Sequence, residues 1–313
     1  MSTRVAVIGV GHLGHHHARL YAARGDVQLE AVVDSDPGRA AEIAGRHGTR
    51  ALTDYRDLLG AVDAVSVAVP TVTHHEIALE FLQSGAHVLV EKPITRSLAE
   101  ADSLIEAAGR AGRRLHVGHT ERFNPAVQAV RPLVKRARFI ECQRLGAFSP
   151  RSLDVDVVLD LMIHDLDVIL SLVQAPMIGI DAVGVNALTE RVDIANARLR
   201  FDDGAAANVT ASRISMARTR KLRIFQPESY LSVDYETRQV QHYFVRKSPG
   251  ARPEIVGREI EVESGEPLAL EIDAFLRAAS GEEDNGVSGA DGRRALAAAL
   301  QVIEAIERAP EAP

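Results

Sequence analysis

The first 120 residues alternate short apolar runs with longer stretches of helical character. Continuous apolar runs are typical of parallel strands buried on both faces, and alternation with helices is typical of a doubly wound sheet. The pattern predicts an α/β domain with five strands and four helices between them. The expected strands are RVAVIGV (4–10), LEAVVD (29–34), AVSVAVP (64–70), HVLVEKP (87–93) and RLHVGHT (114–120).

From about Phe123 the pattern changes, because strand-like segments follow one another without helices between them. Such a series predicts a large, mainly antiparallel open sheet in an α+β domain. Helical spacing of apolar residues marks one helix inserted after the first of these strands, at 154–173, and two helices near the end of the chain, at 267–280 and 290–308. The expected strands are 138–146, 178–188, 193–201, 204–214, 220–227, 229–235, 239–246 and 258–264.

We therefore expect two domains, a Rossmann-type α/β domain over 1–122 and an α+β domain over 123–313. The last helix, about 290–308, is a candidate to pack back on the first domain.

Composition and charge narrow the class of protein. The chain is 46% hydrophobic and 25% charged, which predicts a globular protein with a packed core. A net charge of −7 without a block of Lys and Arg argues against nucleic acid as a partner. The single cysteine, Cys142, excludes an intrachain disulfide, and no apolar run is long enough for membrane insertion. Without a signal-peptide pattern, the N-terminus predicts a cytoplasmic protein.

The segment GVGHLG, Gly9 to Gly14, places the G-x-G-x-x-G pattern between a strand and a helix. Its glycines allow a tight turn, close approach of a pyrophosphate and close packing of helix on strand. Asp34 ends the next strand about twenty residues later, where a carboxylate binds the ribose hydroxyls. This carboxylate would repel the 2′-phosphate of NADP, and no arginine follows Asp34 directly, so we expect NAD. The site lacks further features for a flavin. The candidate cofactor contacts are Gly9, Gly11, His12, Leu13, Gly14, Asp34, Pro70, His74, Glu91 and Lys92.

Histidines next to each other in the sequence do not predict a metal site. His15, His16 and His17 occupy consecutive helical positions, which point in different directions, and His74 and His75 do the same. We expect the first three on the helix surface, and no metal site, since one cysteine cannot supply a thiolate cluster.

Two segments carry candidate catalytic groups. Lys92 follows an apolar strand, at the edge where open α/β sheets bind ligands; a solvated lysine paired with Glu91 is the alternative. Asp160 and His164 lie four residues apart on a predicted helix, with Asp165 pointing elsewhere. The alternative there is a packed helix whose polar residues face water. Oxidation of an alcohol needs a base, a polar group for the developing alkoxide and a nearby nicotinamide.

The glycine turn, the strand-end acid, the EKP segment and the D-x-x-x-H-D segment together resemble the Gfo/Idh/MocA oxidoreductase family over essentially the whole chain. The resemblance implies that Lys92 polarises the reacting hydroxyl, that His164 is the general base and that Asp160 positions it. It also implies a commonly cis proline after Lys92, and a C-terminal sheet whose open face pairs subunits into a homodimer or homotetramer.

One departure from the family concerns the substrate. The run DVDVVL replaces the glycine-rich run that many members have, and GHTERFNPA (118–126) resembles a branch that acts on nucleotide sugars. That branch implies NAD-dependent oxidation of the 3-hydroxyl of a UDP-N-acetylhexosamine, above all UDP-N-acetylglucosamine, for the 3-amino sugar of some lipid A. The uronic acid analogue is a near neighbour. Candidate substrate contacts are His119, Glu121, Arg122, Asn124 and Arg213, while Arg218 and Arg220 are equally compatible with a solvated strand end. The alternatives are a dehydrogenase of a free sugar or inositol-like polyol, and a non-catalytic dinucleotide-binding sensor.

Overall fold

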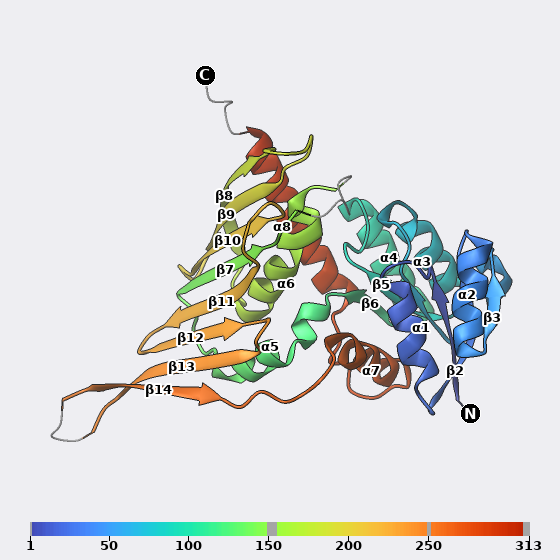
Figure 1. Cartoon of the computed structure of the whole chain (residues 1–313), viewed down its shortest axis with the longest axis horizontal. Helices are drawn as coiled ribbons and strands as arrows, with labels where there is room; N and C mark the ends of the chain where they lie inside the picture. The colour runs from blue at the N-terminus through green and yellow to red at the C-terminus, as the bar shows by residue number, and fades with distance from the viewer. Residues whose placement is uncertain (1, 149–154, 249–251, 309–313) are drawn as a thin grey trace. The chain divides into compact units, whose positions relative to one another are not determined.

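The computed structural model describes residues 2–148, 155–248 and 252–308, and the chain forms two compact units (Figure 1). The first unit comprises residues 1–120 and 266–296, and the second comprises residues 121–265 and 297–313. The predicted boundaries had assigned everything after residue 122 to the second domain. A helical segment from the C-terminal part of the chain therefore belongs to the first unit.

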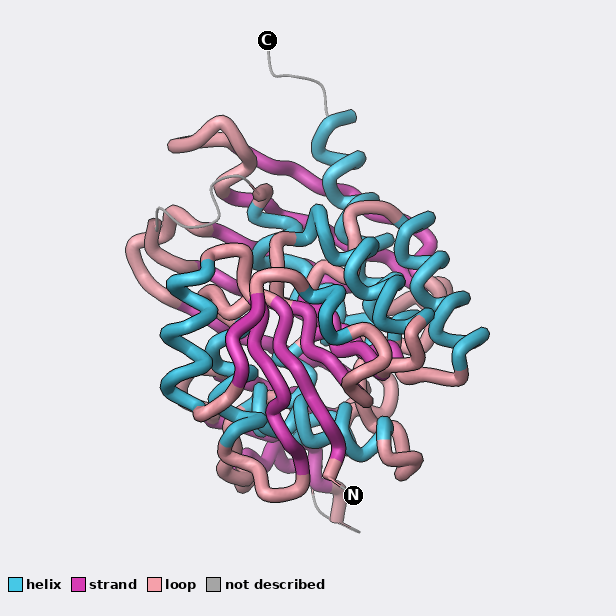
Figure 2. The backbone as a smooth tube through the Cα atoms, turned by 90° about the vertical axis from the view of Figure 1, so that its right-hand side faces the viewer, coloured by secondary structure: helices cyan, strands magenta, loops and turns pink. Residues whose placement is uncertain are grey.

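The first unit is built on a parallel sheet of six strands in the order β3-β2-β1-β4-β5-β6. Helices lie on both sides of these strands (Figure 2). The strands are β1 (Thr3–Ile8), β2 (Val27–Val33), β3 (Arg50–Leu52), β4 (Ala64–Val67), β5 (His87–Glu91) and β6 (Leu115–Gly118). The helices are α1 (Gly14–Ala22), α2 (Pro37–His47), α3 (His74–Gln83), α4 (Leu98–Ala111) and α7 (Pro267–Ala279), with 3-10 helices η1 (Tyr55–Leu58) and η2 (Thr71–Thr73). The predicted doubly wound fold is confirmed, but the edge strand β3 was not predicted.

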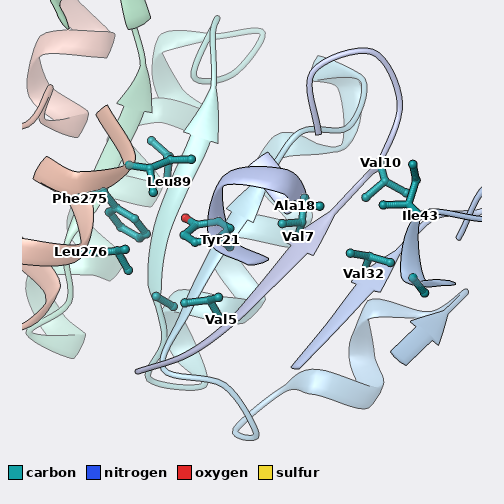
Figure 3. Packing of buried hydrophobic residues seen from close by; sticks show 13 residues of the cluster. Val5, Val7, Val10, Ala18, Tyr21, Val32, Ile43, Leu89, Phe275 and Leu276 are labelled. Atoms are coloured by element: carbon teal, nitrogen blue, oxygen red, sulfur yellow. The ribbon is translucent and has the colours of Figure 1, made fainter. Parts of the chain in front are cut away.

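Helix α7 belongs to the first unit because its apolar face completes one side of the core. Phe275 is fully buried and lies in the same cluster as Val7 of β1, Tyr21 of α1 and Leu89 of β5 (Figure 3). The long helix α8 (Gly289–Arg308) begins in this unit as well. A Cβ atom on Gly292 would lie 2.5 Å from Cγ2 of Val117, so the first turns of α8 pack closely on β6.

The second unit contains a sheet of eight strands in the order β14-β13-β12-β11-β7-β10-β9-β8. The predicted mainly antiparallel sheet is confirmed, with one parallel pair, β7 and β10. The strands are β7 (Phe139–Leu145), β8 (Met177–Val185), β9 (Ile194–Phe201), β10 (Ala206–Ser212), β11 (Thr219–Gln226), β12 (Ser229–Asp234), β13 (Gln239–Arg246) and β14 (Glu254–Ile260). The last strand begins four residues earlier than the predicted segment 258–264, because Glu254 to Ile260 pairs with β13.

The helical insertion after β7 differs from the prediction in its first turn. Residues Val158–Met162 form a π-helix, η5, and α6 (Ile163–Leu172) continues from it. The predicted helix began at residue 154, which lies outside the described residues. The unit also contains η3 (Thr120–Phe123), which begins in the first unit, α5 (Pro125–Val130) and η4 (Arg131–Leu133).

Candidate active site

The glycine turn after β1 has the close backbone packing that a dinucleotide site needs. Gly9 has φ of +84°, and a Cβ atom there would lie 2.6 Å from the carbonyl oxygen of Ala68. A Cβ atom on Gly14 would lie 1.8 Å from the carbonyl oxygen of Gly9, whereas one on Gly11 would meet nothing within 4 Å. The side of Gly11 is therefore open, as close approach of a diphosphate requires. Helix α1 begins at Gly14 without a side-chain cap from Leu13, which leaves its N-terminus suited to an anion.

Asp34 follows β2 as predicted and is held in place by backbone groups. Its side chain is 7% exposed, with Oδ2 accepting from the N–H of Val10 at 3.0 Å and Oδ1 from the N–H of Asp36 at 3.0 Å. Arg39 of α2 also reaches this carboxylate, with Nη1 at 3.3 and 3.4 Å from the two oxygens. A fixed carboxylate beside the glycine turn fits the ribose of a dinucleotide. Arg39 was missed because it lies five residues after Asp34, on the first turn of α2.

The histidines at the start of α1 do not all lie on the helix surface as predicted. The rings of His15 and His16 are 3.8 Å apart between centroids, and each is 6.4 Å from the ring of His12. His17 instead is 1% exposed, with Nε2 3.1 Å from Oε1 of Glu91. The prediction of three surface histidines is therefore wrong for His17, because that position of α1 faces the sheet. Among the described residues no group of three or more histidine, cysteine, aspartate or glutamate side chains is placed to hold a metal ion.

The turns after β4 and β5 are tied together by His74. Its ring is 1% exposed, and its two nitrogens lie 2.9 Å from the carbonyl oxygen of Val69 and 3.0 Å from that of Pro93. Burial lowers the pKa of His74, against the opposing effect of these carbonyl groups. Pro70, the residue before η2, lies in the first of the two turns.

Lys92 follows β5 directly, at the carboxyl end of the strand, and the Lys92–Pro93 peptide is cis. Its backbone N–H donates to Oε2 of Glu91 at 3.3 Å. Glu91 itself is only 7% exposed, so its carboxylate points into the unit. Lys92 thus lies at the carboxyl edge of the parallel sheet, where open α/β sheets bind their ligands.

Asp160 and His164 lie on one continuous helical segment of the second unit. Asp160 is in the π-turn and His164 in the first turn of α6, and both side chains are partly buried. The spacing argument assumed an α-helix throughout, and the π-turn at Asp160 changes that assumption. Single π-turns inside helices are frequent at functional sites.

The polar residues that follow His164 do not face water. Asp165 is 2% exposed and accepts from both Nε and Nη2 of Arg144, each at 2.9 Å. Asp167 is 1% exposed and accepts two hydrogen bonds of 2.7 Å from Arg122. The alternative of a packed helix with solvated polar residues is therefore wrong for these two aspartates, since two buried arginines pair with them.

The predicted substrate residues near the start of the second unit are engaged with the protein. Glu121 accepts from Arg144 at 2.8 Å, and Asn124 caps α5 by accepting from the N–H of Ala126 at 3.1 Å. Burial alone would raise the pKa of Glu121, but Arg144 and Arg220 hold this pKa below its usual value. His119 is 1% exposed, immediately after β6.

Three arginines on and after the sheet strands differ in their surroundings. Arg213 is 6% exposed, and its Nη2 donates to the carbonyl oxygens of Val155 and Val192. Arg218 is exposed and pairs with Glu236. The side chain of Arg220 is 34% exposed, with Nη1 3.8 Å from Glu121.

Two family models match these two parts of the chain. The model of the oxidoreductase family with an NAD-binding Rossmann fold matches residues 3–119, and that of the GFO/IDH/MocA C-terminal domain matches residues 136–229. The chain belongs to the Gfo/Idh/MocA oxidoreductase family. As a member of that family it is an enzyme with an NAD-binding Rossmann domain, and the glycine turn with Asp34 fits that cofactor.

Proteins similar to this chain differ in how much sequence they share with it. UDP-N-acetylglucosamine 3-dehydrogenase from Acidithiobacillus ferrooxidans is 43% identical over 97% of both chains. Its solved structure has a TM-score of 0.92 at 42% identity, covering 98% of both chains. Levoglucosan dehydrogenase in complex with NADH has a TM-score of 0.86 at 22% identity and 98% coverage of both chains, which shows the fold alone. Inositol 2-dehydrogenase from Rhizobium meliloti is 24% identical over 98% of this chain and 97% of its own.

Proposed function

We propose that this protein is an NAD-dependent dehydrogenase that oxidises the 3-hydroxyl of a UDP-N-acetylhexosamine, UDP-N-acetylglucosamine in the first place, to the 3-keto sugar. The observation that carries the proposal is the 43% identity, over 97% of both chains, to an enzyme named for that reaction. The chain also has Lys92, Asp160 and His164, the three residues to which the family resemblance assigns catalytic roles.

The proposed roles follow from the charge that oxidation of an alcohol develops. NAD, when bound, supplies the hydride acceptor. Lys92 donates a hydrogen bond to the hydroxyl oxygen and stabilises its growing negative charge. His164 accepts the hydroxyl proton, and Asp160 holds the imidazole in the orientation and tautomer for that task.

The substrate contacts of His119, Glu121, Arg122, Asn124 and Arg213 stay predictions. Each is buried or nearly so and already engaged with the chain, so a substrate role would use the remaining donors and acceptors of these groups. Arg220 is more accessible than Arg122 and Arg213, with its Nη1 3.8 Å from Glu121. Its guanidinium group could therefore also contact a diphosphate. The cytoplasmic location and the link to lipid A likewise stay predictions; no helix of the described residues is long and apolar enough to cross a membrane.

The test is the near-ultraviolet absorbance of NADH, with purified protein, NAD and a panel of substrates. The panel holds UDP-N-acetylglucosamine, its uronic acid analogue, free N-acetylglucosamine and inositol, with an amine acceptor system to draw off the ketone. We expect NADH only with the acetylglucosamine nucleotide. Reaction with free sugars or inositol alone would replace the proposal by the polyol alternative, and no reaction with any substrate, in protein that binds NADH, would favour the sensor.

We also infer that the protein forms a homodimer or homotetramer through the open face of its eight-stranded sheet. A row of four aromatic rings crosses this face, with Phe225 and Tyr230 4.7 Å apart, and Tyr230 and Tyr243 5.6 Å apart, between centroids. Phe139 continues the row 5.7 Å from Phe225. Phe225 is 36% and Tyr243 40% exposed, whereas the neighbouring Ile224 is buried on the opposite face.

Light scattering after gel filtration tests this assembly. Phe225→Ser with Tyr243→Ser should shift the mass toward the monomer, because it removes apolar area from the proposed contact. Met216→Ser is the matched control, since Met216 is fully exposed outside the strands. A monomeric wild-type protein would contradict the inference.

A further inference from the structure

A chain of four buried polar side chains runs beneath the nucleotide turn to Lys92. Tyr21 Oη lies 2.8 Å from Ser66 Oγ, Ser66 Oγ lies 3.0 Å from Nδ1 of His17, and Nε2 of His17 lies 3.1 Å from Oε1 of Glu91. The residues come from α1, β4 and β5, and none is more than 7% exposed. Figure 3 shows the ring of Tyr21 among the apolar residues of the core.

The direction of these hydrogen bonds follows from their two ends. Burial raises the pKa of Tyr21 far above its usual value, so the hydroxyl keeps its proton and donates to Ser66. Burial acts to raise the pKa of Glu91 too, but His17, Lys92 and His74 bring it below its usual value, so this carboxylate only accepts. Every group is satisfied when Ser66 donates to Nδ1 of His17 and His17 donates from Nε2 to Glu91. The imidazole is then neutral, with its proton on Nε2.

The far side of the Glu91 carboxylate is fixed as well. Oε2 accepts the backbone N–H of Lys92 at 3.3 Å. Gly118 lies opposite Glu91 on β6, and a Cβ atom there would lie 2.9 Å from both Cδ and Oε2 of Glu91. The carboxylate thus occupies a slot that only glycine leaves open.

We propose that His17 and Glu91 are positioning residues for Lys92. The hydrogen-bond chain holds the Glu91 carboxylate in one orientation, and the carboxylate holds the backbone from which the Lys92 side chain projects. Because His17 lies on α1, directly after the glycine turn, the same chain links the helix that receives the diphosphate to the turn that carries the lysine. The inference rests on the proposed role of Lys92 in the reaction.

The first test reads the proton on His17 and needs no substrate. In protein with ¹⁵N-labelled histidine, the wild-type His17 should be the neutral Nε2–H tautomer near neutral pH. In Glu91→Gln the amide oxygen accepts from the N–H of Lys92, so the amide NH₂ faces His17 and donates to it. Nε2 of the imidazole must then accept, and His17 should change to the Nδ1–H tautomer. A wild-type imidazolium or Nδ1–H form, or an unchanged tautomer in Glu91→Gln, would overturn the chain as described.

The second test separates positioning from packing by kinetics. His17→Gln keeps a donor for Glu91 and should stay within about threefold of the wild-type kcat. His17→Phe removes it, and we expect a kcat lower by about 10- to 100-fold with little change in KM for NAD. Without the imidazole, burial raises the pKa of Glu91, so kcat of His17→Phe should also fall as the pH is lowered. His75→Gln is the control, because His75 contacts Ser103 at 3.1 Å in the same unit.

The outcomes distinguish this inference from the proposed function. If kcat falls equally in His17→Gln and His17→Phe, or falls in neither, His17 contributes only to packing and the inference is wrong. Gly118→Ala checks the same point without substituting any of the four residues, because its methyl group displaces the Glu91 carboxylate. It too should lower kcat more than it weakens NADH binding. If the nucleotide sugar is not a substrate, the tautomer test still stands, since it reads the chain itself.

Discussion

We expect the pair formed by Asp34 and Arg39 to set how strongly the enzyme prefers NAD to NADP. In NADP a 2′-phosphate would take the place of the ribose hydroxyl that donates a hydrogen bond to the Asp34 carboxylate. At about 4 Å and an effective dielectric constant of about 20, two unit charges interact by about 4 kcal/mol. Arg39 offsets part of this repulsion, but its side chain is 48% exposed, so we assign it about 1 kcal/mol. A net preference of about 2–3 kcal/mol corresponds to a selectivity of about 30- to 150-fold.

Single substitutions should move this selectivity in opposite directions. Arg39→Ala leaves the carboxylate alone with the phosphate, and the preference for NAD should rise about fivefold. Asp34→Ala removes both the repulsion and the charged hydrogen bonds to the ribose. NAD binding should therefore weaken by about 10- to 100-fold, and NADP should bind about as well as NAD or better.

Fluorescence titration with NADH and NADPH measures these dissociation constants without any substrate. Arg46→Ala is the control, because Arg46 lies on the same helix and pairs with the exposed Glu42. A selectivity that falls in Arg39→Ala, or that changes equally in Arg46→Ala, would refute the reasoning.

Three further predictions concern catalysis and stability. Lys92→Met should abolish turnover while the dissociation constant for NADH stays within about twofold, and wild-type turnover would remove Lys92 from the reaction. Burial and the adjacent Arg113 and Arg114 lower the pKa of His87 to about 4. The unfolded state therefore binds more protons below about pH 6.5, and urea unfolding should show stability falling between pH 6.5 and 4 by about 2 kcal/mol more in the wild type than in His87→Gln. Arg144→Met should cost about 3–5 kcal/mol in the same assay, because it leaves the buried carboxylate of Asp165 without its partner. Asp165→Leu in addition should restore only part of this loss, because Glu121, the second acidic partner of Arg144, remains.

Most of the fold could be predicted because its strands are either continuously apolar or strictly alternating. The edge strand β3 escaped because only Arg50, Ala51 and Leu52 form it, and these residues carry neither pattern. Membership of α7 in the first unit could not be predicted either, since the amphipathic pattern of a helix does not specify which core Phe275 enters.

The cofactor part of the site was largely predictable, because its residues act through local geometry. Gly9, Gly14 and Asp34 lie at fixed distances along one strand-turn-helix-strand unit. The contacts that fix the site are nonlocal instead. His17 meets Glu91 across 74 positions of sequence, and no spacing rule connects them. The partner of Asp165, Arg144, is likewise on a different element, so the sequence indicated only that this aspartate points elsewhere.

The divided first unit has a consequence for biosynthesis. Its β-sheet lies wholly within residues 1–120, but Phe275 of its core is translated only after residues 121–265 of the second unit. At about 5–20 residues per second, the nascent nucleotide unit waits roughly 8–30 s on the ribosome with that side of its sheet uncovered. This exposed surface is a natural substrate for chaperones that bind nascent chains. We therefore expect such chaperones to be released when α7 emerges from the ribosome, and not when the six strands are complete.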